Sequence, residues 1–174
     1  MRLSYFSGVV LLFLVACSCE KQELSLPPTQ IDDVEVPNDL APVFQTLLNK
    51  VNEIRATGCP CGSEFFPAVA PLSWNAQLAT AAERHTTDMA NNEHFSHTGT
   101  DGSSSGQRAT AAGYNWRTVG ENIAFGYTSA TAVFEGWKSS PGHCRNMMNA
   151  AFREMGAAEA DNYWTQAFGA RLAD

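Results

Sequence analysis

The helical spacing of apolar residues most limits the folds open to this chain. From Asn38 to Gly58, apolar residues recur every three or four positions, which predicts a first helix with Pro42 in its first turn. The same spacing predicts a second helix from Asn75 to about Asn92. Three more helices are predicted over 102–112, over 130–139 and onward from a Ser140 N-cap. Each helix has an apolar side that needs a surface to pack against.

Strand patterns are confined to the second half of the chain. Residues 154–160 and 163–172 flank Asp161-Asn162, an arrangement that predicts a β-hairpin. Residues 119–127 mix Ile, Ala, Phe and Tyr with two glycines and predict a strand or a strand-like loop. Helices followed by a terminal hairpin favour one mixed α and β domain built in layers, which we place at residues 38–174.

The N-terminal residues predict an exported, lipid-anchored protein. Arg2 precedes an apolar run that ends at Cys17, a pattern typical of a secretion signal over residues 1–16. The run is too short to span a bilayer, which takes about 20 apolar residues. The tetrapeptide 14–17, Leu-Val-Ala-Cys, resembles a bacterial lipobox, which implies that Cys17 becomes the acylated N-terminus of the mature chain. The alternative is an ordinary signal peptide that leaves Cys17 as a plain thiol.

Charge limits the partners of the mature chain. Residues 17–37 carry three prolines and mostly acidic charge, which predicts a flexible tether. Once Arg2 is removed with the signal, 10 basic residues face 18 acidic ones, a formal charge of −8. This balance argues against nucleic acid as a partner and against attraction to anionic lipid, so the predicted membrane contact is the lipid anchor. We expect a cell-envelope protein, at the outer membrane or cell surface, exported by the general secretory route.

Six short motifs occur in an order that resembles a known family. They are Pro-Leu-Ser-Trp-Asn at 71–75, His-Thr-Thr-Asp-Met-Ala at 85–90, Phe-Ser-His-Thr-Gly at 95–99, Gly-Glu-Asn-Ile-Ala at 120–124, Trp137 with Ser-Ser-Pro-Gly-His at 139–143, and Tyr-Trp-Thr-Gln at 163–166. The series resembles the CAP superfamily of cysteine-rich secretory, antigen 5 and pathogenesis-related proteins, in its bacterial form. The resemblance implies an α+β fold, a three-layer α-β-α sandwich with a C-terminal antiparallel hairpin and a cleft lined by histidine and glutamate.

The same resemblance implies which residues line the cleft. His97 and Glu121 match the family's first histidine and first glutamate. The second glutamate falls near Ser140 and the second histidine is Tyr163 here, so His143 of the Ser-Pro-Gly-His segment is the natural substitute. The predicted cleft residues are His97, Glu121, Ser140, His143, Tyr163 and Gln166. No catalytic residue is assigned, although Glu121 and His143 are the candidates.

Histidine and carboxylate side chains are plausible ligands for a divalent metal such as zinc. The predicted ligands are His97, Glu121 and His143, and open zinc sites take three protein ligands and a water. The positive end of the helix that begins at Ser140 is expected to lower the pKa of His143 and keep its ring neutral for metal binding. The alternative is a hydrogen-bond network of the same three residues without metal.

Other polar and aromatic residues have weaker predictions. Ser140, His143 and Glu121 supply the residue types of a serine-hydrolase triad, but the Ser140 hydroxyl is expected to cap a helix and Ser140 does not lie in a Gly-x-Ser-x-Gly elbow. His85 is predicted to be a hydrogen-bonded core residue and His94 a solvated one, and neither is predicted to bind metal. Among the aromatic residues, the two tryptophans Trp137 and Trp164 are predicted in the core, and Trp116 and Tyr127 are the better candidates for exposure.

The cysteines of the domain are expected to form a disulfide. Bacterial relatives that this chain resembles pair the cysteines equivalent to Cys61 and Cys144, a bridge worth about 4 kcal/mol that would pin the helix carrying His143 against the first helix. Cys59 is left over and, with Cys19, is either free or paired elsewhere. A structural zinc held by Cys59, Cys61, His143 and Cys144 is a rival, although the spacing is not that of two separated pairs.

These features lead to a functional hypothesis. The chain is expected to be a non-catalytic, membrane-anchored binding or interaction module. Its cleft would recognise an unknown extracellular small molecule, lipid or peptide, with or without a divalent metal. The alternative is a metal-dependent hydrolase of envelope polymer or peptide, in which His97, Glu121 and His143 surround a metal-activated water.

Overall fold

The structure is a computed structural model that describes residues 40–172. The predicted signal (1–16), the lipidation site Cys17 and the tether (17–37) lie outside this range. Within it, no helix has the length and apolar character needed to cross a membrane.

Five helices and six strands make up the described domain. The helices are α1 (Pro42–Thr57), α2 (Ala76–Asn92), α3 (Ser105–Ala111), α4 (Ala130–Ser139) and α5 (Pro141–Met147). The strands are β1 (Cys59–Cys61), β2 (Glu64–Phe66), β3 (Ser73–Trp74), β4 (Trp116–Phe125), β5 (Glu154–Ala160) and β6 (Tyr163–Arg171).

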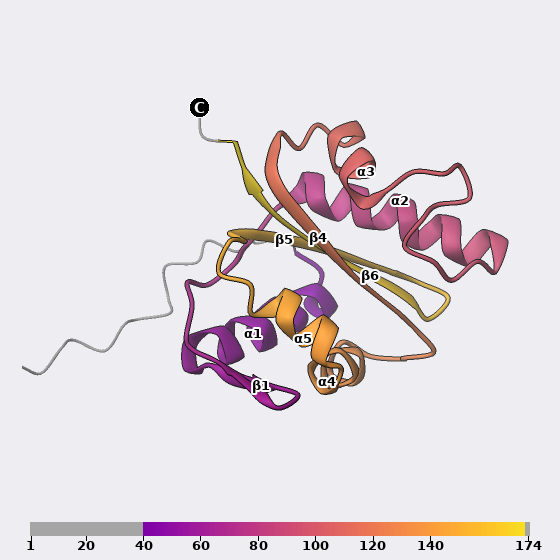
Figure 1. Cartoon of the computed structure of the whole chain (residues 1–174). Coiled ribbons are helices and arrows are strands. Elements are labelled where there is room, and N and C mark those ends of the chain that lie inside the picture. The colour runs from indigo at the N-terminus through magenta and orange to yellow at the C-terminus, as the bar shows by residue number, and fades with distance from the viewer. Residues whose placement is uncertain (1–39, 173–174) are drawn as a thin grey trace, which may run out of the picture. The chain divides into compact units, whose positions relative to one another are not determined.

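A four-stranded sheet separates two layers of helices. Its order is β3-β5-β6-β4, with β3 parallel to β5 and the other neighbours antiparallel. Helices α2 and α3 lie on one side of the sheet, and α1, α4 and α5 lie on the other (Figure 1). The predicted three-layer α-β-α sandwich with a C-terminal hairpin is confirmed.

Local sequence explains where the helices begin and end. Asn75 caps α2 by accepting a hydrogen bond from the N–H of Leu78, and Gly58 ends α1 at a φ of 76°, a backbone region that favours glycine. The third helix begins at Ser105, after a capping box between Ser104 and Gln107, and not at the predicted residue 102.

Sequence analysis missed the shortest strands. β1 and β2 form a small hairpin, and β3 has only two residues, whose place in the sheet depends on the main chain of β5. Segments of two or three residues cannot show a period, so only tertiary pairing identifies them.

Buried Arg55 joins the first helix to the segment that follows α5. Its guanidinium donates to the carbonyl oxygens of Ala70, Met147, Asn149 and Phe152 at 2.7–3.3 Å. Burial, assisted by the charge of Arg153, lowers the pKa of Arg55 to about 10. These bonds hold α5, the helix that carries His143, against α1.

The exposure of the aromatic residues agrees with the prediction in part. Trp137 and Trp164 are buried, as predicted. Trp116 and Tyr127 are only partly exposed, because Trp116 packs on the α2 side of the sheet and Tyr127 packs against the larger core. They are nevertheless more exposed than Trp137 and Trp164, so the prediction is confirmed in part. Phe95 and Phe125 are instead 53% and 54% exposed.

Candidate functional site

Glu121 is the centre of a buried ionic network. It lies on β4, and its side chain is 5% exposed. Its Oε1 accepts from Nδ1 of His97 and its Oε2 from a guanidinium N–H of Arg108, both at 2.8 Å. Burial favours a higher pKa for Glu121, but the hydrogen bond from His97 and the charge of Arg108 outweigh it, and the pKa falls below 4.5. Glu121 is therefore a stable carboxylate with both oxygens engaged.

The loop between α2 and α3 presents His97 to solvent. The end of α2 at Glu93 adopts a left-handed conformation that turns the chain into this loop. Arg108 donates to the carbonyl oxygens of His97 and Ser103, so the residue that neutralises Glu121 also holds the loop. The His97 side chain is 58% exposed, and the bond to Glu121 fixes its ring through Nδ1 and leaves Nε2 available to a ligand.

His85 lies beneath the network as a neutral core histidine. It is fully buried, and its Nε2 donates to the carbonyl of Ser96 at 2.9 Å. Burial, reinforced by the charge of Arg108, lowers its pKa below 6.5 despite the nearby Glu121. The predicted core role is confirmed, but its position 3.9 Å from Glu121 Oε1 was not foreseen.

His143 reaches the same region from the opposite helix layer. It is the third residue of α5, and its carbonyl accepts from Asn122 at 3.2 Å. Asn146, one turn further on, donates to the carbonyl of Glu121 at 3.1 Å. The pKa of His143 is lowered, as predicted; burial is the larger cause and the charge of His97 the smaller.

The remaining predicted cleft residues differ in exposure. Ser140 occupies the predicted N-cap position, yet its hydroxyl makes no cap hydrogen bond, so that part of the prediction was wrong. Gln166 is fully buried and accepts a hydrogen bond from Asn122. Tyr163 is 8% exposed, with its ring 4.3 Å from that of Phe125. Gln166 and Tyr163 are therefore buried beside the candidate site and do not line an open surface.

The donor set fits a divalent cation only in part. Each carboxylate oxygen of Glu121 already accepts a hydrogen bond. Glu121 is therefore better suited to orient the His97 ring than to bind a metal ion directly. The two imidazoles of His97 and His143 remain as donors. Two ligands fall short of the three that open zinc sites use. Among the described residues, His97, Glu121 and His143 do not form a group of three donor atoms within 4.8 Å of one another.

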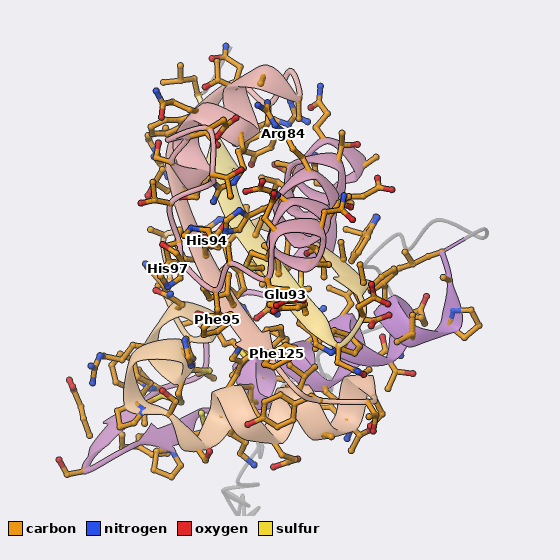
Figure 2. All side chains as sticks on the ribbon, turned by 90° about the vertical axis from the view of Figure 1, so that its right-hand side faces the viewer. Arg84, Glu93, His94, Phe95, His97 and Phe125 are labelled. Atoms are coloured by element: carbon orange, nitrogen blue, oxygen red, sulfur yellow. A yellow bond between two sulfur atoms is a disulfide. The ribbon has the colours of Figure 1, made fainter. Side chains whose placement is uncertain are left out.

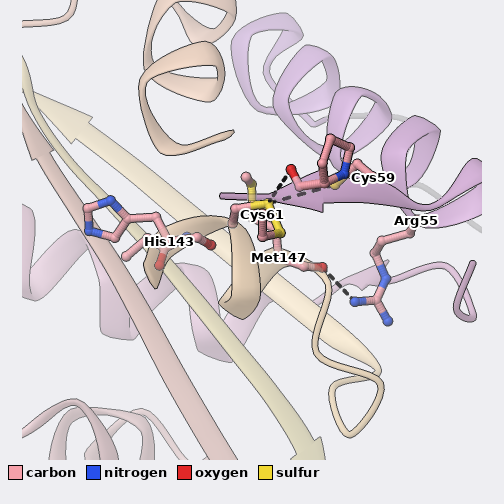
Figure 3. Close-up of a disulfide and its surroundings, with 8 residues drawn as sticks. Arg55, Cys59, Cys61, His143 and Met147 are labelled. Atoms are coloured by element: carbon pink, nitrogen blue, oxygen red, sulfur yellow. Dashed lines mark hydrogen bonds between the residues drawn. A yellow bond between two sulfur atoms is a disulfide. The ribbon is translucent and has the colours of Figure 1, made fainter. Parts of the chain in front are cut away.

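The cysteines form a separate centre. A disulfide joins Cys61 of β1 to Cys144 of α5, as expected, and Cys59 is buried and free. His143 points away from these sulfur atoms (Figure 3). The rival zinc set of three cysteines with His143 is therefore not assembled.

Sequence reasoning missed Arg108, which contacts both Glu121 and the loop that carries His97. An isolated arginine in a short helix carries no motif. The one available signal was chemical, since a carboxylate predicted in a sandwich core needs a cationic partner.

Known proteins resemble this chain in sequence and in structure. The family model described as "CAP: Cysteine-rich secretory protein family" matches residues 48–168. Two Bacillus subtilis proteins, the uncharacterized membrane protein YlbC and the uncharacterized protein YkwD, are 33% and 31% identical over 100 residues each, 58% and 56% of this chain. The matched regions span 29% and 39% of those relatives, so this chain accounts for well under half of their length.

Solved structures share the fold. An extracellular Bacillus anthracis protein containing an SCP domain matches 74% of this chain and 40% of its own, at 29% identity and a TM-score of 0.64. An outer surface protein from Borrelia burgdorferi matches 74% of this chain and 92% of its own, at 20% identity and a TM-score of 0.61, and shows the fold alone.

Proposed function

Because the chain belongs to the cysteine-rich secretory protein (CAP) family, we propose that it is an exported binding module, anchored to a membrane surface through Cys17. The names of similar proteins support an extracytoplasmic place, since one is a membrane protein and another an extracellular protein. The N-terminal signal and lipobox-like segment support the anchor.

The proposed ligand site is the pair His97 and His143. The observation that carries it is the orientation of an exposed His97 ring by a buried carboxylate, beside a half-buried His143 whose lowered pKa keeps it neutral. Neutral imidazoles coordinate divalent metals and accept hydrogen bonds. A divalent ion such as zinc, when bound, would supply a positive charge that attracts an acidic ligand group.

An exposed apolar patch lies beside the site. Phe95 and Phe125 flank the ring of Tyr163, with centroids 6.5 and 4.3 Å from it. In Figure 2, Phe95 lies between His97 and Phe125. Two half-exposed phenylalanines next to polar groups are typical of ligand-binding surfaces. This patch supports an extracellular small molecule, lipid or peptide with an apolar part as the ligand.

The low pKa of Glu121 favours a binding function over a hydrolytic one. A general base works best with a pKa near the working pH, whereas the pKa of Glu121 is held below 4.5. A metal-dependent hydrolase of envelope polymer or peptide remains the competing function. Hydrolysis of such a substrate, lost in His143→Ala, would support the hydrolase.

A metal titration tests the site. We expect Zn²⁺ added alone to shift the NMR signals of His97 and His143 with weak affinity, and His97→Ala or His143→Ala to reduce the affinity at least tenfold. His94→Ala is the matched control, since the ring of this nearby histidine hydrogen-bonds to the carbonyl of Thr98. Equal zinc binding by the His97 and His143 variants and by wild type would remove these residues from the proposed site.

Cell fractionation tests the anchor. Expressed in a bacterial host with lipoprotein processing, the wild-type chain is expected in the membrane fraction with an acylated Cys17. Cys17→Ser is expected to move it to the soluble fraction. An unmodified wild-type N-terminus would contradict anchoring and leave the ligand site untouched.

A further inference from the structure

Three sulfur atoms meet between β1 and α5. Cys59, Cys61 and Cys144 are all buried, and their Sγ atoms lie within 4.8 Å of one another. The free thiol of Cys59 is 3.7 Å from Sγ of Cys144, which is already bonded to Cys61 (Figure 3). A thiol in contact with a disulfide sulfur has the components of thiol–disulfide exchange.

Strand geometry makes Cys144 the shared partner. Cys59 and Cys61 are two residues apart in β1, so both side chains point to the same face, toward Cys144. Residues at this spacing lie about 6.6 Å apart along a strand, and a disulfide needs Cβ atoms about 3.5–4.5 Å apart. A bond between Cys59 and Cys61 is therefore disfavoured, whereas either of them can bond to Cys144.

We propose that Cys144 exchanges between two disulfide partners, Cys61 and Cys59, within the folded domain. The Cys59 thiol loses its proton to solvent, and its sulfur attacks Sγ of Cys144. The bond between Cys59 and Cys144 forms as the bond between Cys144 and Cys61 breaks. Cys61 leaves with the electron pair and takes up a proton. The number of disulfides is unchanged, so no oxidant or reductant is needed.

Exchange would move the attachment point of α5 along β1. Cys144 directly follows His143 in α5, and the end of the β1–β2 hairpin contacts the start of α5, where a Cβ on Gly62 would lie 3.1 Å from Pro141. A bond to Cys59 in place of Cys61 shifts this tie by two residues. Burial of all three sulfurs protects them from external thiols, so the exchange is intramolecular. Burial also raises the pKa of Cys59, which makes the exchange slow.

Disulfide mapping of a variant tests the proposal. In Cys61→Ala, refolded from the reduced and unfolded chain in the presence of glutathione disulfide, we expect a bond between Cys59 and Cys144, detected as a link between tryptic peptides 56–84 and 139–145. Cys59→Ala is the matched control and is expected to keep the bond between Cys61 and Cys144. A folded Cys61→Ala protein in which Cys59 and Cys144 are both free thiols would overturn the proposal.

The wild-type chain provides an independent measurement. The chain is incubated at mildly alkaline pH for a prolonged time, quenched with acid, unfolded and alkylated, so that the alkyl label marks the free thiol. Fragmentation of the labelled peptide at Pro60 in the mass spectrometer then separates label on Cys59 from label on Cys61. We expect most label on Cys59 and a growing minority on Cys61. If Cys61→Ala does not fold, this measurement decides, and label confined to Cys59 refutes exchange.

Discussion

Arg108 has two roles that only its position in the fold explains. It neutralises the buried carboxylate of Glu121, and it holds the loop that presents His97. A buried ion pair contributes little net stability compared with an apolar pair, but removing one partner leaves a charge without solvation. The network is therefore more sensitive to single substitutions than its hydrogen bonds alone suggest.

Arg108→Met is expected to lower the free energy of unfolding by about 3 to 5 kcal/mol, because it leaves Glu121 buried and unpaired. Urea denaturation measures the loss. Adding Glu121→Gln to this variant should restore part of it, and Arg84→Met, which breaks an exposed ion pair, should change stability little. A small loss in Arg108→Met would mean that water reaches Glu121.

Acid is expected to destabilise the domain in two steps. The folded pKa of His85 lies below its ordinary 6.5, so the unfolded chain binds more protons and stability is lost as pH falls below 6.5. The folded pKa of Glu121 lies below 4.5, so its contribution is present above 4.5 and lost below it. Urea denaturation at pH 7.5, 5.5 and 4 should show both steps, and His85→Gln should reduce the first. An equally steep first step in His85→Gln would assign it to another group, such as His143.

Contacts between whole elements bring the site together. Helix α2 packs on β5 so closely that a Cβ on Gly156 would collide with the backbone nitrogen of Ala79. Helix α5 reaches the edge strand β4 through hydrogen bonds from Asn122 and Asn146. Glu121, on β4, accepts hydrogen bonds from Arg108 of α3 in one layer and from Asn146 of α5 in the other, so helices from both layers converge on β4.

Gly156→Ala is expected to destabilise the domain by about 1 to 3 kcal/mol or more, because the added methyl group meets backbone atoms that cannot move independently. Thermal and urea unfolding measure the effect. Gly142→Ala is the control, since a Cβ there meets no atom within 4 Å and alanine suits a helix better than glycine. Equal losses in both variants would contradict the close approach of α2 and β5.

Two long-range ties fix the position of α5, one to α1 and one to β1. Arg55 connects α1 to the segment after α5, and the disulfide closes a loop over a sequence separation of 83 residues. Such ties limit how far α5, and His143 with it, can move relative to the sheet. The geometry of the candidate site therefore depends on the whole described domain.

Cys144→Ala removes every disulfide that α5 can form within the described domain, and we expect a loss of about 4 kcal/mol in unfolding free energy. Urea denaturation under non-reducing conditions measures it. Cys59→Ala should cost much less, because it leaves the bridge to Cys61 intact. A Cys144→Ala variant as stable as wild type would show that packing alone positions α5.

Local sequence was sufficient for the long helices, the terminal hairpin and the family resemblance, because periodicity, caps and short motifs are properties of neighbouring residues. It also predicted three side chains of the candidate site, His97, Glu121 and His143. Three features depend on the tertiary structure alone: Glu121 accepts a hydrogen bond from Arg108, Gln166 is fully buried, and Cys59 contacts a disulfide. Those contacts join residues that are 13 to 85 positions apart in the sequence. Their energies come from burial and charge pairing, which a local sequence pattern does not predict.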